Sequence, residues 1–433
     1  MLQKRTLQNG LQVITYDMPS IKSVHVSITV KGGSIVDEKK KSGLAHYMEH
    51  MLVQGIPSMP DAQQLSTFIE SLSGVYNAYT SGLTVQFFIR VPYLHIEDAM
   101  KIASEVFFAP LFPEASIEKE RTAVLNEITQ ELDSRWFKFN EFFRKTRFTP
   151  KSVLHNRIGG TVQTVKEIQR TDLLSYWQKY FTPKNTYVFI GGHFSDKELD
   201  ALLDTYFGSI PVSHEFSGFP TITEKDFKPR QVAVRRDMTL KTNYIDLSFP
   251  TIGINGTPKE HIYHFLAQTI LGRLRSSRLF RILRYEKGLV YDVSIASTEW
   301  PEIGYSMIYS EVLPESLEEV TQTIVDEVRR FMHDGPTQGE LDFAKNFLTN
   351  QWLMAFDNPH SIAGWVEGQF LWHDKILLPE DDIALLESVT TKDIREHMQK
   401  YWNIRLAQLI IQGPLEASEA NQKKFETILE KLD

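Results

Sequence analysis

The chain contains no cysteine, so no disulfide can form, and a metal ion would have to be bound by His, Asp or Glu. It also lacks an apolar run long enough to cross a bilayer. The first twenty residues show neither the apolar core of a signal peptide nor the Arg- and Ser-rich composition of a transit peptide. We therefore expect a cytoplasmic protein without a membrane span.

Basic residues are fewer than acidic residues: the chain has 47 Lys and Arg residues and 55 Asp and Glu residues, for a formal net charge of −8. This balance does not favour binding to nucleic acid, and we expect no such partner. The 433 residues, 42% of them hydrophobic and 24% charged, are enough for two or more ordinary globular domains.

Strand-like and helix-like patterns alternate on both sides of a polar segment at 212–230, which contains Gly and Pro and is typical of a linker. We predict a domain at 1–211, a linker at 212–230 and a second domain at 231–433. The order of the patterns predicts an α+β protein of two homologous α/β halves, in which helices flank an antiparallel-rich sheet.

A repeat supports the two halves, because several residues recur 221 positions later, and in each copy a helix leads into a short apolar strand. The recurring residues are Asp172 and Asp393, the Gln-Lys-Tyr triplets at 178–180 and 399–401, and Gly192 and Gly413.

The segment SGLAHYMEHML contains His46, Glu49 and His50 within a helical pattern. Residues four apart lie on one face of a helix, so both imidazoles can reach one metal ion. Glu49 lies beside the second imidazole and can take a proton from metal-bound water. This is the His-x-x-Glu-His order of the inverted zinc peptidase motif. A merely solvated helix face is the alternative, but the chain has only 13 His residues.

A catalytic zinc site needs a third protein ligand. The helical segment IEKERTAVLNEITQEL carries Glu120, Glu127 and Glu131 on one face. Spacing alone does not select among these three carboxylates, and a stripe of this kind is more often exposed to solvent.

The chain resembles the insulinase/pitrilysin (M16) family of zinc peptidases, whose motif is His-x-x-Glu-His followed, after 76 residues, by Glu. Here residues 51–126 separate His50 from Glu127. The resemblance therefore implies that Glu127 is the third ligand and that Glu120 supports the site. It extends over nearly the whole chain, is greatest to the short two-domain bacterial branch and to mitochondrial processing peptidase subunits, and implies the LuxS/MPP-like metallopeptidase fold.

The second half resembles the family's inactive domain and lacks a second ligand set, since Phe347 stands 220 positions after Glu127. One Zn²⁺ per chain is expected. The resemblance further implies that Arg284 and Tyr291 bind the substrate and stabilise the developing oxyanion. It also implies that Asn77 and Ala78, on a strand with a free edge, bind an extended peptide.

The implied function is that of a zinc-dependent endopeptidase that cleaves unfolded peptides inside a chamber formed by two paired chains. A homodimer is expected, and a heterodimer with a degenerate homologue is the alternative. Two other functions remain open: a dedicated processing peptidase for one precursor or leader peptide, and a non-catalytic scaffold subunit of the same fold.

Overall fold

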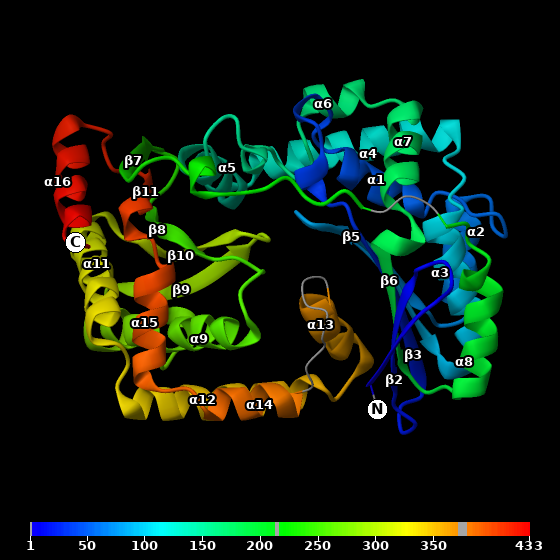
Figure 1. Cartoon of the computed structure of the whole chain (residues 1–433). Coiled ribbons are helices and arrows are strands. Elements are labelled where there is room, and N and C mark those ends of the chain that lie inside the picture. The colour runs from blue at the N-terminus through cyan, green and yellow to red at the C-terminus, as the bar shows by residue number, and fades with distance from the viewer. Residues whose placement is uncertain (1, 213–215, 371–378) are drawn as a thin grey trace. The chain divides into compact units, whose positions relative to one another are not determined.

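The computed structural model describes residues 2–212, 216–370 and 379–433 and divides into two compact units (Figure 1). Unit 1 comprises Met1–Ser134, Asn156–Pro220 and Ala355–Leu371, and unit 2 comprises Arg135–His155, Thr221–Met354 and Trp372–Asp433. Two segments, 135–155 and 355–371, belong to the unit that is formed mainly by the other half of the chain. Residues 213–215 of the predicted linker lie outside the described residues.

Unit 1 contains a six-stranded sheet with the order β1-β2-β6-β3-β5-β4. Only the pair β2–β6 is parallel. The strands are β1 (Leu2–Thr6), β2 (Gln12–Asp17), β3 (Ser23–Lys31), β4 (Val75–Thr80), β5 (Thr84–Pro92) and β6 (Thr186–Gly192). The α-helices of the unit are α1 (Leu44–Leu52), α2 (Ala62–Ser71), α3 (Ile96–Phe108), α4 (Glu114–Asp133), α6 (Val162–Glu167), α7 (Arg170–Tyr180), α8 (Asp196–Leu203) and α13 (Pro359–Phe370).

Unit 2 contains a five-stranded sheet with the order β7-β11-β8-β10-β9, in which only β7–β11 is parallel. The strands are β7 (Gln231–Arg236), β8 (Asn243–Ile252), β9 (Val290–Glu299), β10 (Ile303–Val312) and β11 (Gln408–Gly413). The α-helices are α5 (Arg135–Arg147), α9 (Pro258–Gln268), α10 (Arg278–Phe280), α11 (Leu317–Asp334), α12 (Gln338–Ala355), α14 (Pro379–Glu387), α15 (Thr391–Tyr401) and α16 (Glu419–Glu430).

The two sheets have the same topology apart from β1, so β2, β6, β3, β5 and β4 correspond to β7, β11, β8, β10 and β9. The recurring residues have equivalent places. Asp172 and Asp393 each accept a backbone N–H at the start of their helix, α7 and α15, which is a capping box. Gly192 and Gly413 each end a strand where a Cβ would lie under 2.5 Å from a neighbouring atom. The predicted fold class is confirmed.

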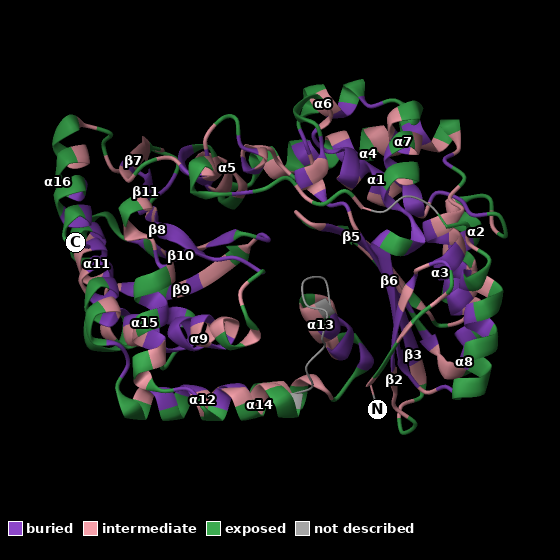
Figure 2. Cartoon of the chain, viewed as in Figure 1, coloured by how far each residue is buried: buried purple, intermediate pink, exposed green. Residues whose placement is uncertain are grey.

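Each sheet has one apolar face, which packs under helices to form the buried core of its unit (Figure 2). In unit 1 this face carries alternate residues of β3, such as Val26 and Ile28, against α3. In unit 2 it carries alternate residues of β8, such as Leu247 and Phe249.

The opposite face of each sheet is more polar and is covered by a helix from the other half of the chain. In unit 1, α13 (orange in Figure 1) contacts β3 and β6, and Glu367 accepts a hydrogen bond of 2.6 Å from Gln86. In unit 2, α5 contacts β11, and its fully buried Arg147 pairs with Asp246 of β8 at 3.0 Å. The ring centres of Phe143 and Tyr305 lie 3.3 and 3.9 Å from the Arg147 guanidinium carbon.

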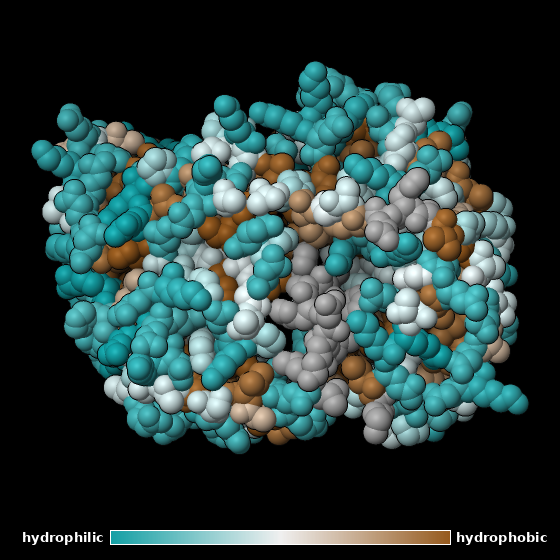
Figure 3. Space-filling model, viewed as in Figure 1, coloured by the Kyte–Doolittle hydropathy of each residue, from teal (hydrophilic) through white to brown (hydrophobic). Residues whose placement is uncertain are grey.

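Among the described residues, no helix combines the length and apolar character needed to cross a membrane. The face drawn in Figure 3 is mostly hydrophilic, and its apolar residues form separate small groups.

Candidate metal centre

The helix α1, which carries the predicted His-x-x-Glu-His motif, has its N-terminus fixed by a buried carboxylate. Asp37 accepts hydrogen bonds from the backbone N–H groups of Gly43 (2.9 Å) and Ala45 (3.2 Å). Burial raises the pKa of Asp37 to about 8, while the backbone N–H donors act in the opposite direction. Gly43 has a φ of 95°, and a Cβ there would lie 2.8 Å from the oxygen of Gly159, so α1 begins where only glycine fits well.

The two histidines of the motif lie one turn apart on α1, and their ring centres are 4.9 Å apart. The neighbouring apolar residues Tyr47, Met48 and Met51 are fully buried and pack α1 into the core of unit 1. The His46 and His50 side chains are 16% and 23% exposed, so a metal ion between them would be accessible to substrate yet partly desolvated.

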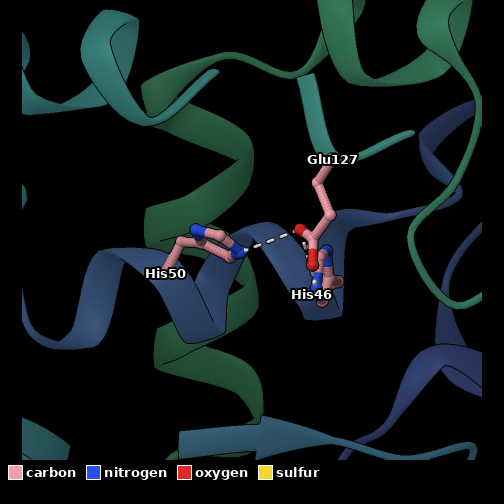
Figure 4. A group of neighbouring side chains, drawn as sticks. All are labelled: His46, His50 and Glu127. Carbon is pink, nitrogen blue, oxygen red and sulfur yellow. Dashed lines mark ion pairs between the residues drawn. The ribbon is translucent and has the colours of Figure 1, made fainter. Parts of the chain in front are cut away.

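The third predicted ligand comes from α4, and Figure 4 shows the Glu127 carboxylate directed towards both rings. One of its oxygens, Oε2, lies 3.7 Å from Nε2 of His46 and 3.5 Å from Nε2 of His50. These separations exceed ordinary N–H···O hydrogen-bond lengths. They match zinc coordination, because bonds of about 2.0–2.2 Å in a tetrahedron place neighbouring ligand atoms about 3.4 Å apart.

Within the described ranges, these three residues are the one group of His, Asp or Glu side chains close enough to hold a metal ion, and their ligand atoms all lie within 4.8 Å of one another. Two imidazoles and one carboxylate form the donor set of zinc sites that keep an open catalytic position. The residues present therefore fit a zinc ion.

Glu120, also on α4, contacts the His50 ring at the nitrogen that does not face Glu127. Its Oε2 lies 3.2 Å from Nδ1 of His50. A proton on Nδ1 leaves the lone pair of Nε2 directed towards Glu127, which is the orientation that a metal ligand needs. Burial lowers the pKa of His50, but the hydrogen bond with Glu120 and nearby carboxylate charges outweigh burial, so the pKa lies above its ordinary value.

His46 has different surroundings. Burial lowers its pKa, and the charge on His50 acts in the same direction. Within the described part of the chain, no group hydrogen-bonds to its buried Nδ1 atom. A Cβ on Gly159 would lie 3.8 Å from that atom, so the backbone of the 157–160 segment passes close to the ring.

Glu49, the predicted general base, lies on α1 between the two imidazoles in sequence and does not belong to the ligand group. Its Oε2 accepts a hydrogen bond of 2.7 Å from Oγ1 of Thr80, the last residue of β4. The sequence alone did not predict a role for Thr80. The signal available was its place three residues after Asn77 on the same strand.

The predicted peptide-binding residues lie on β4, which is an edge strand and pairs only with β5. Asn77 is exposed and Ala78 is half-buried against the core of unit 1. An edge strand presents backbone donors and acceptors without partners in its own sheet. This placement is compatible with the predicted role of both residues.

Arg284 and Tyr291 lie near each other in unit 2. The guanidinium carbon of Arg284 lies 5.2 Å from the centre of the Tyr291 ring, and its Nη1 donates to the carbonyl of Val290 at 3.2 Å. Tyr291 lies on the edge strand β9 and is 81% exposed. A phenol and a guanidinium with this exposure can donate hydrogen bonds to a bound peptide.

The part of unit 2 that corresponds to the metal centre carries different residues. Glu340, which corresponds to Glu120, accepts two hydrogen bonds of 2.6 and 2.7 Å from Arg278. Phe347, which corresponds to Glu127, packs against the apolar core of unit 2. In the duplicated half these two positions therefore serve an ion pair and apolar packing.

Two family models match the chain. The model described as Insulinase (Peptidase family M16) matches residues 12–145, which include the metal centre, and the model described as Peptidase M16 inactive domain matches residues 167–348. Together they match well over half of the chain.

Curated relatives and solved structures agree with this match. The uncharacterised zinc protease YmxG of Bacillus subtilis is 25% identical over 362 residues, or 83% of this chain and 86% of the relative. A protease structure from Helicobacter pylori shares the fold, with a TM-score of 0.85 and 19% identity over 96% of this chain and 99% of that one. A structure from Pseudomonas fluorescens described as a peptidase M16 inactive domain has a TM-score of 0.86 and 18% identity, covering 97% and 99%. The chain belongs to peptidase family M16.

Proposed function

We propose that the protein is a zinc-dependent endopeptidase that cleaves unfolded peptides. The observation that carries this proposal is the convergence of His46, His50 and Glu127 from two helices, with the Glu49 carboxylate left over beside them. A structural site would be expected to use all four side chains for the metal, whereas a catalytic site keeps one position open.

A bound zinc ion supplies a Lewis acid and a water molecule of lowered pKa. Beside such an ion, Glu49 would serve as the general base towards the attacking water and as the proton donor to the leaving amine. Glu120 keeps His50 in the tautomer whose Nε2 lone pair is available.

The peptide binds in an extended conformation along the free edge of β4, where backbone hydrogen bonds give affinity without demanding a particular sequence. Asn77 adds hydrogen bonds from its amide, and Ala78 contributes backbone groups. Arg284 and Tyr291 donate hydrogen bonds to the substrate carbonyl oxygen as negative charge develops on it.

We further propose that two copies of the chain pair to enclose the substrate, with one zinc ion in each. The presence of both the metal residues and the Arg284/Tyr291 pair in one chain supports a homodimer. A heterodimer with a degenerate homologue is the competing arrangement, and light scattering of the purified protein distinguishes the dimer from a monomer that needs another partner.

The proposal is tested with Glu49→Gln, which keeps the shape of the side chain and removes the base. The variant should retain zinc and lose peptide cleavage by a factor of about 10²–10⁴. Glu118→Gln is a matched control, because Glu118 is an exposed carboxylate on α4 that pairs with Arg121. Full activity of Glu49→Gln refutes the role of Glu49, and a wild-type protein that has neither zinc nor cleavage indicates a scaffold function.

A further inference from the structure

Thr80 links the edge strand to the general base. Its Oγ1 donates a hydrogen bond of 2.7 Å to Oε2 of Glu49 and lies 3.5 Å from the carbonyl oxygen of Ala45, one turn earlier on α1. Alternate residues of β4 face the same side, and Tyr76, Ala78 and Thr80 are the half-buried set. The free edge of β4 and the carboxylate of Glu49 are therefore joined through one hydroxyl group.

We propose that Thr80 is a positioning residue that holds the Glu49 carboxylate in its working orientation and couples that orientation to the peptide bound along β4. This inference rests on the proposed function and deepens it. A glutamate has three side-chain torsions, and a half-exposed carboxylate samples several rotamers unless a partner fixes it. Threonine suits the task, because its branched side chain is stiff at χ1 and strongly preferred in strands.

Geometric control of this kind has a large effect on rate. A displacement of about 1 Å in a catalytic group can cost a factor of about 10². Thr80 also lies on the same strand as Asn77. Any shift of β4 on peptide binding therefore moves the Thr80 hydroxyl, which donates a hydrogen bond to Glu49. The base is then best placed when a peptide occupies the strand edge.

The duplicated half provides an internal comparison. Thr80 pairs with Val85 across β4 and β5, and the equivalent last pair of β9 and β10 is Glu299 with Gly304. The carboxylate of Glu299 lies 3.6 Å from Nδ1 of His261. The position 220 residues after Glu49 is Thr269. The half without the base therefore also lacks the hydroxyl at the end of its edge strand.

The test compares Thr80→Val, which keeps the shape and removes the hydroxyl, with Thr80→Ser, which keeps the hydroxyl. We expect kcat of Thr80→Val to fall by a factor of about 10–100 with KM within about twofold of wild type. Thr80→Ser should recover kcat to within about threefold, because its hydroxyl can still donate. Zinc content, melting temperature and the affinity of the metal-free protein for a fluorescein-labelled peptide should stay unchanged in both variants.

Ser66→Ala is the matched control, because Ser66 makes a 2.7 Å hydroxyl bond to Tyr76 on the same side of the same strand but does not contact Glu49. The inference is overturned if Thr80→Val turns over like wild type, if Thr80→Ser is as slow as Thr80→Val, or if Ser66→Ala causes the same loss of kcat. A wild-type protein that cleaves no peptide contradicts the proposed function itself, whereas cleavage that is insensitive to Thr80→Val contradicts only the role of Thr80.

Discussion

Removing the Asp37 carboxylate should destabilise unit 1 and weaken the metal centre together. Asp37 is 5% exposed, and the two backbone N–H groups that donate hydrogen bonds to it at the start of α1 are also buried. In Asp37→Ala both donors lose their acceptor, and a buried donor without a partner costs about 1–3 kcal/mol. The expected loss in free energy of unfolding is therefore about 2–6 kcal/mol.

The assay is urea unfolding followed by tryptophan fluorescence, with zinc affinity measured by chelator competition. Asp61→Ala is the control, because Asp61 caps α2 through a similar 2.9 Å bond to the N–H of Gln64 in an exposed position. Water can replace an exposed cap, so this variant should lose only about 0.5–2 kcal/mol and keep its zinc affinity. A loss of free energy of unfolding below about 1 kcal/mol in Asp37→Ala refutes the reasoning. It would mean that leaving the two buried N–H groups without an acceptor does not destabilise the fold.

Three further outcomes follow from buried or charged groups. Arg147→Met leaves the Asp246 carboxylate buried without its partner and should cost about 3–5 kcal/mol by urea unfolding, whereas replacing both residues by apolar ones should restore most of this. Burial lowers the pKa of His397 to about 4, so the unfolded chain binds a proton below about pH 6.5 and the folded chain does not. The free energy of unfolding should therefore fall by about 1.6 kcal/mol between pH 6.5 and pH 5 through this residue, and His397→Phe should remove that part of the pH dependence. Glu120→Gln should weaken zinc binding by a factor of about 10–100 in chelator competition, because His50 loses its charged partner; unchanged affinity would contradict that role.

The spacing of residues along the sequence was sufficient to predict the parts of the fold and of the site that are formed by residues close together in the chain. The helical spacing of His46 and His50 predicts two imidazoles on one face, and the structure places their rings 4.9 Å apart. The repeat that relates Gly192 to Gly413 predicts two similar halves, and the matching strand orders confirm them. Glu127 required the family resemblance, because spacing within α4 does not separate it from Glu120 or Glu131.

Contacts between distant segments could not be predicted in this way. The helices α5 and α13 each pack on the sheet of the other half of the chain. Nothing in the sequence of either helix indicates which sheet it covers. Arg147 is an example, since a charged residue is expected at the surface until Asp246, 99 positions later, is placed beside it. The bond between Thr80 and Glu49 likewise arises only when the end of a strand is brought beside a helix.

The measurement that tests the metal centre most directly is zinc analysis of the purified protein and of two single variants on the same face of α4. Wild type should hold one zinc ion per chain, Glu127→Ala should lose it, and Glu131→Ala should keep it, because Glu131 pairs with Arg157 at 2.7 Å and does not belong to the ligand group. If Glu127→Ala retains stoichiometric zinc with the affinity of wild type, the assignment of His46, His50 and Glu127 as the ligands is contradicted.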